Sequence, residues 1–280
     1  MGQWFETGFS GADRVKREQE EGFGPDRFWV SKSREEGGKI VGPKEFVFVD
    51  DEPTCMWEHN PKINNSFKTI LTCLRGVEDE TPCCEKLIRP NGESARYYVG
   101  YFTVVDCSSW TGKDGKVHQY EMRFFPAKTG TILKLRMNRV ERGSLASILW
   151  KAKRSPGEKV PRVGDEFEYV KQVDIAKLFS VASYRGRKIS DIFAEANANP
   201  TKEVGTKDDG SPLTLLDRVK GLFQVHLDEN GKILPEIVPF NYERLLRPLS
   251  PDQMKKRLMG VKVDADDLDD KSSDGNSVPF

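Results

Sequence analysis

A stretch of aromatic and β-branched residues near the middle of the chain places the tightest constraint on its fold. It covers residues 96–126 and reads RYYVGYFTVVDCSSWTGKDGKVHQYEMRFFP. Successive side chains in a strand point to opposite faces, so residues 97–105 are apolar or aromatic on both faces. Asp114-Gly115 supplies the positive φ values that a tight turn needs. The stretch therefore predicts a β-hairpin, or two neighbouring strands, in the wall of a small barrel.

Segments on either side of this hairpin complete the predicted barrel. The run from Thr129 to Arg142 has apolar residues at helical spacing, and Gly143 follows it as a stop. A helix inserted between strands, with basic loops at the barrel mouth, is typical of an OB-type fold. We therefore predict a mainly β, α+β chain built on a five-stranded OB-type Greek-key barrel. Its other strands are expected at residues 27–30, 45–52, 55–60, 67–74, 145–153 and 165–170.

The chain of 280 residues divides into four regions by composition and pattern. They are an N-terminal arm, an OB-fold nucleic-acid-binding core, a mixed and mostly helical extension and a disordered acidic tail, at residues 1–26, 27–171, 172–260 and 261–280. In the extension, residues 173–179 and 215–223 predict short amphipathic helices. Ser250 as N-cap and Pro251 as first helical residue open a last helix that reaches Met259. The tail is acidic and of low complexity, which predicts disorder.

The formal net charge of zero conceals a strong asymmetry along the chain. Residues 264–280 hold six Asp and one Lys, a formal charge of −5, so the preceding residues together carry +5. Within these, residues 96–162 hold fourteen Lys or Arg against five Asp or Glu. A basic body with an acidic tail is expected when the tail competes with a polyanion for one groove, although some acidic tails only keep proteins soluble.

Aromatic and basic side chains alternate along the central stretch in a way that suits a single strand of nucleic acid. Bases have apolar π-faces and phosphates are anionic, so both kinds of side chain would contact such a strand. The alternative is a sheet core with solvated charges, because aromatic residues are common in any sheet. The candidate stacking residues are Tyr97, Tyr101, Trp110, Tyr120, Phe124 and Trp150. The candidate phosphate contacts are Lys113, Lys116, Arg123, Lys134, Arg136, Arg139, Lys151, Lys153 and Arg154.

Four residues that can bind zinc, His59, Cys73, Cys83 and Cys84, fall within 26 residues. Adjacent side chains diverge, so Cys83 and Cys84 are not expected to bind one ion together. A Zn²⁺ site at His59, Cys73 and Cys84 then needs Cys55 or another group as its fourth ligand. Buried free thiols without a metal are the alternative. The five cysteines of a chain expected to be intracellular do not predict a disulfide framework.

The sequence lacks the patterns of several other protein classes. It has no run of eighteen apolar residues and no apolar signal core, so we expect a soluble cytoplasmic protein without a membrane partner. It has no P-loop, dinucleotide-binding, nucleophile-elbow or H-E-x-x-H motif, and its three histidines offer few general bases. Asp50-Asp51-Glu52 could bind Mg²⁺, but a turn at a strand end explains these residues equally well. We therefore expect no enzymatic activity.

The order of several short motifs carries a resemblance to a known family. They are an N-terminal WF-x-TG arm, then RFWV, EFVFVDDE, WEHN, FKTILTC and YYVGYFTVVDCSSWT, spread over residues 4–170. This order is similar to that of phage single-stranded DNA-binding proteins distantly related to the helix-destabilising protein of T-even phages. Such relatives often carry a C-P-x-C zinc knuckle, and the matching residues here are Thr81-Pro82-Cys83-Cys84, with Thr81 in place of the first cysteine. The resemblance implies zinc ligands at His59, Cys73 and Cys84.

The acidic tail adds to this resemblance. It ends in Val278-Pro279-Phe280, similar to the tip of bacterial single-stranded DNA-binding proteins. A terminal Phe can enter an apolar pocket with a basic rim on a partner, while the Asp residues steer its approach. The resemblance implies that replication or recombination proteins bind through Asp266, Asp267, Asp269, Asp270, Pro279 and Phe280.

Taken together, the residues and the resemblance predict sequence-independent binding and protection of single-stranded DNA. The expected setting is phage DNA replication, recombination and repair, with the tail recruiting partner proteins. Two alternatives stay open. An RNA-binding OB-fold protein would show the same aromatic and basic residues, and only a preference for ribose would separate it. A scaffold that bridges partners through its arm and tail would bind no nucleic acid.

Overall fold

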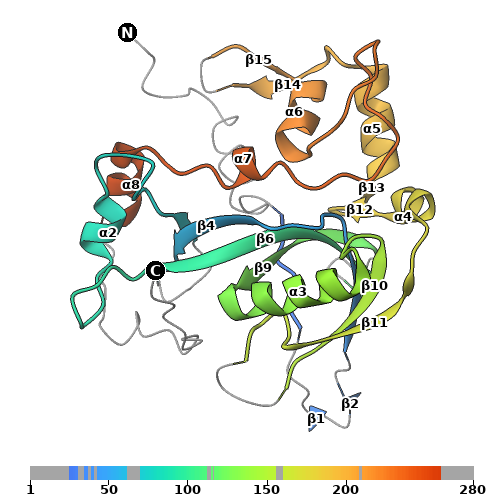
Figure 1. The fold of residues 1–280 in the computed structure, drawn as a ribbon. Coiled ribbons are helices and arrows are strands. Elements are labelled where there is room, and N and C mark those ends of the chain that lie inside the picture. The colour runs from blue at the N-terminus through green and yellow to red at the C-terminus, as the bar shows by residue number, and fades with distance from the viewer. Residues whose placement is uncertain are drawn as a thin grey trace.

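One large β-sheet with helices packed on both faces forms this mixed α+β protein (Figure 1). The computed structural model describes residues 25–30, 35–36, 39–40, 43–61, 70–111, 115, 117–155, 160–207 and 210–259. The main path of the sheet consists of β3 (Lys44–Phe48), β6 (Tyr97–Asp106), β9 (Glu121–Lys128), β10 (Ile148–Lys153), β11 (Glu166–Gln172), β12 (Ser183–Tyr184) and β13 (Arg187–Lys188). These strands lie in the order β11-β10-β3-β6-β9-β12-β13.

The predicted central hairpin is confirmed, because β6 and β9 pair in antiparallel register from Val99↔Lys128 to Asp106↔Glu121. The polar and Gly-rich residues between them leave the large sheet. There β7 (Trp110–Thr111) pairs with β8 (Val117–His118) in a separate two-stranded sheet, and Gly115 between them has a φ of 77°. Asp114, the expected partner of Gly115 in this turn, lies outside the described residues.

Strand β6 has two partners on its other edge, where β3 and β4 (Thr54–His59) follow one another. The sequence predicted a single strand over residues 45–52, but β3 ends at Phe48. The chain leaves the sheet because Asp51 Oδ1 accepts hydrogen bonds from the backbone N–H groups of Leu145 at 2.7 Å and Ala146 at 2.9 Å. Strand β4 then pairs with the short β5 (Leu71–Thr72), all that the described residues show of the strand expected at 67–74.

The five strands expected in a barrel do not close into one. Strands β11, β10, β3, β6 and β9 are neighbours in that order, but no pairing joins β9 to β11 in the described parts of the chain. Residues 26–30 instead run along β9 beyond its bridge to β12: Phe28 N–H donates to Phe124 O at 2.7 Å, and Phe124 N–H donates to Asp26 O at 2.8 Å. Val30 N–H then donates to Arg162 O at 2.7 Å. The sheet stays open because residues 26–30, and not β11, form the hydrogen bonds along this part of β9.

The two faces of the sheet bury two separate hydrophobic cores. On one face, Val99, Tyr101 and Val105 of β6 pack against the helices of the extension, coloured yellow to orange in Figure 1. On the other face, Phe102 and Val104 pack toward α3 (Thr129–Arg142), β10 and residues 28–30. A third and smaller core surrounds the cysteines beside β5.

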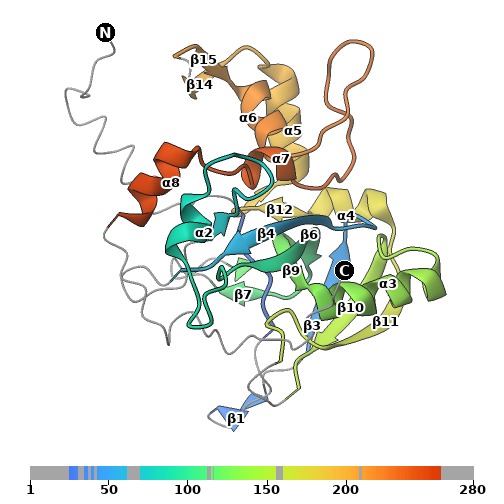
Figure 2. The ribbon, with the colours of Figure 1, turned by 60° about the vertical axis from the view of Figure 1, so that its left-hand side comes forward.

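The helices follow the sequence patterns closely where a cap or a stop is present. The predicted helix after the hairpin is α3, and Gly143 ends it with a φ of 81°. The predicted last helix is α8 (Pro251–Leu258), whose N-cap Ser250 forms a capping box with Gln253; it packs against α2 (Pro82–Lys86) (Figure 2). No helix in the described ranges is both long and apolar enough to cross a membrane. The other helices are α4 (Ile175–Val181), α5 (Ile189–Ala198), α6 (Leu215–Leu222) and α7 (Tyr242–Leu245).

Three further strand pairs complete the described structure. The first is β1 (Glu35–Glu36) with β2 (Lys39–Ile40), and the second is β14 (Glu203–Thr206) with β15 (Pro212–Thr214). The third is β12 with β13, which joins the large sheet through one parallel bridge from Ser183 to Glu121 of β9. This bridge fastens the extension to the central hairpin.

A buried polar network also joins the extension to the sheet. Thr103 of β6 is fully buried, and its Oγ1 accepts the N–H of Phe240 at 2.9 Å and lies 2.7 Å from the hydroxyl oxygen of Tyr242. Tyr242 donates to Asp50 Oδ2, and Asp50 Oδ1 accepts the N–H of Thr103 at 2.9 Å. Burial raises the pKa of Asp50 to about 7, while the hydrogen bonds from Tyr242 and Thr103 oppose that rise.

We expect Asp50→Asn to flatten the pH dependence of stability. The folded-state pKa of Asp50, about 7, lies above the ordinary value of 3.8, so the folded state holds this proton more tightly than the unfolded state. The wild type therefore loses stability from this group as the pH rises from about 4 to about 7, and asparagine does not titrate. Urea unfolding should show that the free energy of unfolding falls less between about pH 5 and about pH 8 in the variant than in the wild type. Equal falls in the two proteins would contradict this role of Asp50.

Gly100 of β6 leaves no room for a side chain. A Cβ at this position would be 2.8 Å from Pro53 Cβ and 2.9 Å from Ile132 Cδ1 of α3. Gly100→Ala should therefore lower the free energy of unfolding by about 1 to 3 kcal/mol, because Pro53 has a rigid ring and the chain around it must shift. Gly130→Ala is the matched control, since nothing lies within 4 Å of its added Cβ, and an alanine in a helix is neutral or stabilising. Urea unfolding measures the free energy of unfolding of both variants, and equal effects of the two substitutions would refute the close packing around Gly100.

Candidate metal centre and nucleic-acid interface

Four buried side chains that can bind a metal ion converge at the end of β4. His59 is the last residue of β4, Cys73 follows β5, and Cys83 and Cys84 lie in α2. One ligand atom from each residue lies within 4.8 Å of those of the other three. The sequence predicted a metal site with three of these residues as ligands, and the folded structure places all four side chains together.

The distances within this cluster match those between the ligands of a tetrahedral ion. Cys73 Sγ lies 3.4 Å from Cys84 Sγ, and Cys84 Sγ lies 3.7 Å from His59 Nε2. Ligand atoms stand roughly 3.5 to 3.8 Å apart around a zinc ion with bonds of about 2.3 Å to sulfur and about 2.0 Å to nitrogen. His59 Nδ1 lies 2.9 Å from Ala95 O, and since a carbonyl only accepts, Nδ1 carries the proton and Nε2 is left to bind a metal.

The expectation that Cys83 and Cys84 diverge is wrong. Both lie in the single turn of α2, and both sulfurs reach the cluster. Cys83 Sγ also accepts the N–H of Leu74 at 3.5 Å, a contact that stabilises a thiolate. Cys83 is therefore the fourth candidate ligand, and Cys55, which is exposed and 3.9 Å from the carbonyl of Pro53, is not.

Hydrogen bonds inside the cluster set the charge of its sulfurs. The hydrogen bond from Cys83 lowers the pKa of Cys73 to about 3, although burial opposes this. The same contact, followed by burial, raises the pKa of Cys83, and burial raises the pKa of Cys84. A cation that binds here would release the protons that the cysteines still hold, because thiolates are the ligands.

Three of the six predicted stacking rings lie in the core. The exposed fractions of Tyr101, Phe124 and Trp150 are 0%, 4% and 1%. Tyr101 and Phe124 contact each other at 5.3 Å between ring centroids on the face that the extension covers, and Trp150 lies in the core on the opposite face. Their predicted role in base stacking does not hold for this structure, because other side chains cover the rings.

The other three predicted rings are more accessible. Tyr97 and Tyr120 are half-buried, and Lys128 Nζ lies 5.3 Å from the ring centroid of Tyr97. Trp110 is 40% exposed and stacks on His118, with ring centroids 4.2 Å apart and planes inclined by 12°. Trp110 is therefore the predicted ring with the most surface available for a base.

The predicted phosphate contacts are spread over several parts of the structure. Lys134, Arg136 and Arg139 lie on α3, Lys151 and Lys153 on β10, Arg154 just after β10, and Arg123 near the opposite end of β9 from α3. Lys113 and Lys116 lie outside the described residues. The fold therefore does not gather these residues into one patch.

Several of these basic side chains have partners on the protein itself. Arg139 pairs with Glu52 at 2.7 Å, and Lys153 pairs with Glu168 at 3.5 Å. Backbone carbonyl groups accept hydrogen bonds from Lys134 and Arg154. Exposed ion pairs of this kind contribute little to stability, so a phosphate can displace the carboxylates at small cost.

Four exposed aromatic rings each lie close to a guanidinium group. Trp29 and Trp57 are 37% exposed, and Trp110 and Tyr169 are 40% exposed. A ring beside a guanidinium offers a π-face and a positive charge to the same ligand. The carbon atoms of the guanidinium groups lie 6.0 Å (Arg27) and 5.7 Å (Arg162) from the Trp29 ring, 4.3 Å (Arg96) from Trp57, 5.5 Å (Arg123) from Trp110 and 5.0 Å (Arg142) from Tyr169.

Sequence reasoning missed Trp29, Trp57 and Tyr169 as candidate binding residues. A usable signal existed for Trp29, because strand alternation in RFWV separates Arg27 and Trp29 from the buried Phe28 and Val30. For the other two rings the neighbouring arginine comes from another element, and no local pattern reveals it.

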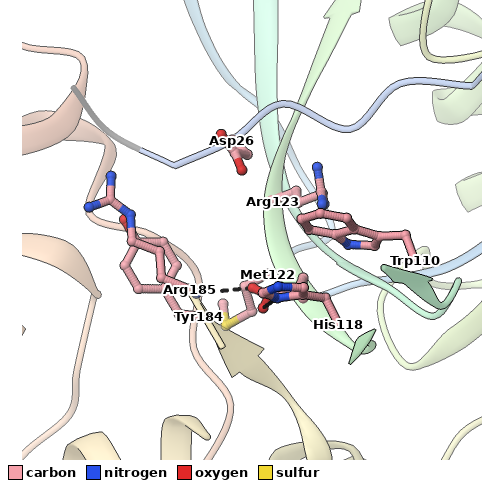
Figure 3. Close-up of a pocket in the computed structure, with 8 residues that line it drawn as sticks. Asp26, Trp110, His118, Met122, Arg123, Tyr184 and Arg185 are labelled. Carbon is pink, nitrogen blue, oxygen red and sulfur yellow. Dashed lines mark hydrogen bonds and ion pairs between the residues drawn. The ribbon is translucent and has the colours of Figure 1, made fainter. Parts of the chain in front are cut away.

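A pocket of about 90 Å³ opens between the β7–β8 hairpin and the turn after β12 (Figure 3). Trp110 and Arg123 lie on one side, and Tyr184 and Arg185 lie on the other. Glu121 holds the two sides together, because its carboxylate accepts the N–H of Arg185 at 3.0 Å and lies 3.2 Å from His118 Nδ1. The sequence did not suggest this pocket, since its two sides come from distant parts of the chain.

Comparisons of this chain with models of protein families, with curated proteins and with solved structures find no match. Two arrangements in the structure bear on function: the cysteine–histidine cluster and the exposed rings with their guanidinium groups.

Proposed function

We propose that this protein binds single-stranded DNA without sequence preference and protects it during phage DNA replication, recombination and repair. The observation that carries the proposal is a set of exposed rings along the edge of β9, each beside a guanidinium group; those of Arg27 and Arg123 are partly buried and pair with Glu58 and Asp106. We call this set the β9-edge surface, made of Arg27, Trp29, Trp110, Arg123 and Arg162. Rings and cations side by side fit the bases and phosphates of an extended strand without reading base edges.

Residues 26–30, which run beside β9, link the parts of the β9-edge surface. Asp26 lines the pocket beside the β7–β8 hairpin, and the chain continues from it along β9 to Trp29. The next residue, Val30, donates its N–H to Arg162 O at 2.7 Å. A single strand laid along this course would pass both exposed tryptophans.

The strand order supports assignment of residues 27–171 to the OB type. The sheet has five neighbouring strands in the order β11-β10-β3-β6-β9, and α3 lies between β9 and β10 in the chain. An OB-type barrel has this same strand order when it is opened between its third and fifth strands. We propose that the core is such an open variant, with residues 26–30 in the gap. The β9-edge surface then lies on the rim of this gap.

The expected energies are sufficient for binding. A base stacked on an aromatic ring contributes roughly 1 to 3 kcal/mol, so two tryptophans with nearby cations supply useful affinity. Stacking tolerates every base, because every base has a π-face. No step in this function requires catalysis, and we propose that the protein is not an enzyme.

The acidic tail completes the proposal as its partner-binding element. Its residues 261–280 lie outside the described residues, so the argument for them is the sequence alone. We propose that its Asp residues and its last residues, Pro279 and Phe280, recruit replication or recombination proteins in the host cytoplasm.

We propose that the cysteine–histidine cluster binds a structural zinc ion. Three thiols and one imidazole form a closed set of four ligands, as in sites that hold a fold together, and no position is left open for chemistry. The ion would tie β4, β5 and α2 together. In this proposal zinc supports the DNA-binding core and does not contact DNA.

Binding of a labelled dT oligonucleotide of about 20 nucleotides, followed by fluorescence anisotropy, tests the DNA proposal. We expect tight binding to dT and weak binding to duplex DNA. The logarithm of the binding constant should fall with the logarithm of salt concentration with a slope of about −2, if three guanidinium groups contact phosphates. A flat salt dependence or no affinity for dT would refute the proposal, and tighter binding to rU would favour RNA as the ligand.

Trp29→Ala should weaken dT binding roughly tenfold or more, because a stacking ring is lost. Trp57→Ala is the matched control: the two rings are equally exposed at 37%, each lies near an arginine, and Trp57 is on β4 rather than on the β9-edge surface. The same anisotropy titration measures both variants. Equal losses in the two would show that the binding surface has been misplaced.

The zinc proposal predicts about one zinc ion per chain in the purified protein, measured by inductively coupled plasma mass spectrometry. Cys83→Ser should lose most of the metal and unfold at a lower temperature, because the ligands hold β4, β5 and α2 together. Cys55→Ser is the control, since Cys55 is exposed and outside the cluster. Purified protein without zinc that also fails to take it up would exclude this site.

A further inference from the structure

The pocket beside the β7–β8 hairpin has walls from two distant parts of the sequence (Figure 3). Trp110 and Arg123 belong to the central hairpin, and Tyr184 and Arg185 belong to the extension. Asp26 lies between the two walls in this view. The lining therefore holds the rings of Trp110 and Tyr184, the imidazole of His118, two guanidinium groups and the carboxylates of Asp26 and Glu121.

The Trp110 wall is held in place before any ligand arrives. The indole stacks on His118 at 4.2 Å, and His118 Nδ1 lies 3.2 Å from the buried carboxylate of Glu121. A ring fixed in this way loses little freedom when a base packs against the part of it that His118 and Arg123 leave accessible. Its exposed fraction of 40% leaves surface for that contact.

Arg123 brings a fixed positive charge to the same wall. Its Nε forms an ion pair with the buried Asp106 Oδ2 at 3.5 Å, which holds the side chain in place. The carbon atom of its guanidinium lies 5.5 Å from the centroid of the Trp110 ring, so a ligand in the pocket can meet both the charge and the ring.

The opposite wall is equally fixed. Ser183 N–H donates to Tyr120 O at 2.9 Å, and Glu121 accepts the N–H of Gly186 at 2.8 Å. Tyr120 and Arg185 both have positive φ, 56° and 51°, a conformation that non-glycine residues rarely adopt outside functional sites and special turns. The surrounding hydrogen bonds hold the two walls at a set separation.

Building on the proposed function, we propose that this pocket takes one nucleobase of the bound strand, between Trp110 and Tyr184, with Arg185 at the adjoining phosphate. A nucleobase is planar, and it carries acceptors that suit Arg123 and N–H donors that suit Asp26. Each of the four bases has both kinds of group, so the pocket adds affinity without choosing a sequence. A bare phosphate would leave the rings unused and would be repelled by Asp26.

This assignment makes the extension part of the DNA site. The core supplies one wall and the turn after β12 supplies the other, so a base in the pocket contacts both. Binding of a strand therefore strengthens the contact between the core and the extension.

Photocross-linking tests the assignment directly. The full-length protein is mixed with a dT oligonucleotide that carries 5-iododeoxyuridine at one position, a base that cross-links to the aromatic ring on which it stacks. After irradiation and digestion, mass spectrometry identifies the modified residue. We expect cross-links at Trp110 or Tyr184. Efficient cross-linking only at other residues would overturn the pocket, while leaving single-stranded DNA binding in place.

Two substitutions with a matched control complete the test. Trp110→Ala should weaken dT binding roughly tenfold, and Tyr169→Ala should not, although both rings are 40% exposed and lie beside an arginine. Arg185→Ala leaves the Trp110–His118 stack intact and should also weaken binding. Wild-type affinity in both pocket variants would overturn the pocket and remove Trp110 from the β9-edge surface, while a loss of affinity in Trp29→Ala would leave single-stranded DNA binding in place. Failure of the wild type to bind dT would overturn the proposed function and the pocket together.

Discussion

Strand β6 is apolar on both faces, and the rest of the structure follows from the need to bury both. Val99, Tyr101 and Val105 require a cover on one side, and the extension provides it. Phe102 and Val104 require a cover on the other, which comes from β10, residues 28–30 and α3. A strand with two apolar faces cannot remain at the surface of a single sheet, because each exposed face would cost the hydrophobic free energy of its side chains. The extension is therefore a structural partner of the core rather than an appendage.

Burial on both faces determines where a ligand can bind. Rings that point from β6 and β9 into either core are covered, so the accessible rings lie at the margins of the sheet. The buried polar groups have the same origin: Thr103, Asp50 and Tyr242 satisfy one another where the extension crosses β6. With both faces covered, exposed rings beside guanidinium groups lie on β4 and β11 as well as at the edge of β9 and on the β7–β8 hairpin. The proposed DNA course and the proposed base pocket both lie at the edge of β9 and the β7–β8 hairpin.

The cysteine–histidine cluster can stabilise elements that are too short to be stable by packing alone. Strand β5 has two residues and α2 has five, and elements this short bury too little surface to hold themselves in place. Four ligands from β4, the end of β5 and α2 close around one point and can fix these elements through a metal ion. Met254 and Leu258 of α8 pack in the same small core, so the cluster also supports the last helix before the tail. The four candidate ligands, the short elements β5 and α2 and the helix that precedes the tail thus all lie in one small core.

Elements with local signals could be predicted from the amino-acid order. The pairing of β6 with β9, the bounds of α3, the capping of α8 by Ser250 and the closing pair β10–β11 all follow from side-chain periodicity, turn residues and caps. Which rings are covered could not be predicted in this way, because alternation assigns Tyr101 and Phe124 to a face but does not reveal that the extension lies on it. The path of the chain likewise decided that Cys83 joins Cys73, Cys84 and His59, and that residues 26–30 take the edge of β9 and leave the barrel open. Such outcomes depend on contacts between distant segments, and a local pattern contains no information about them.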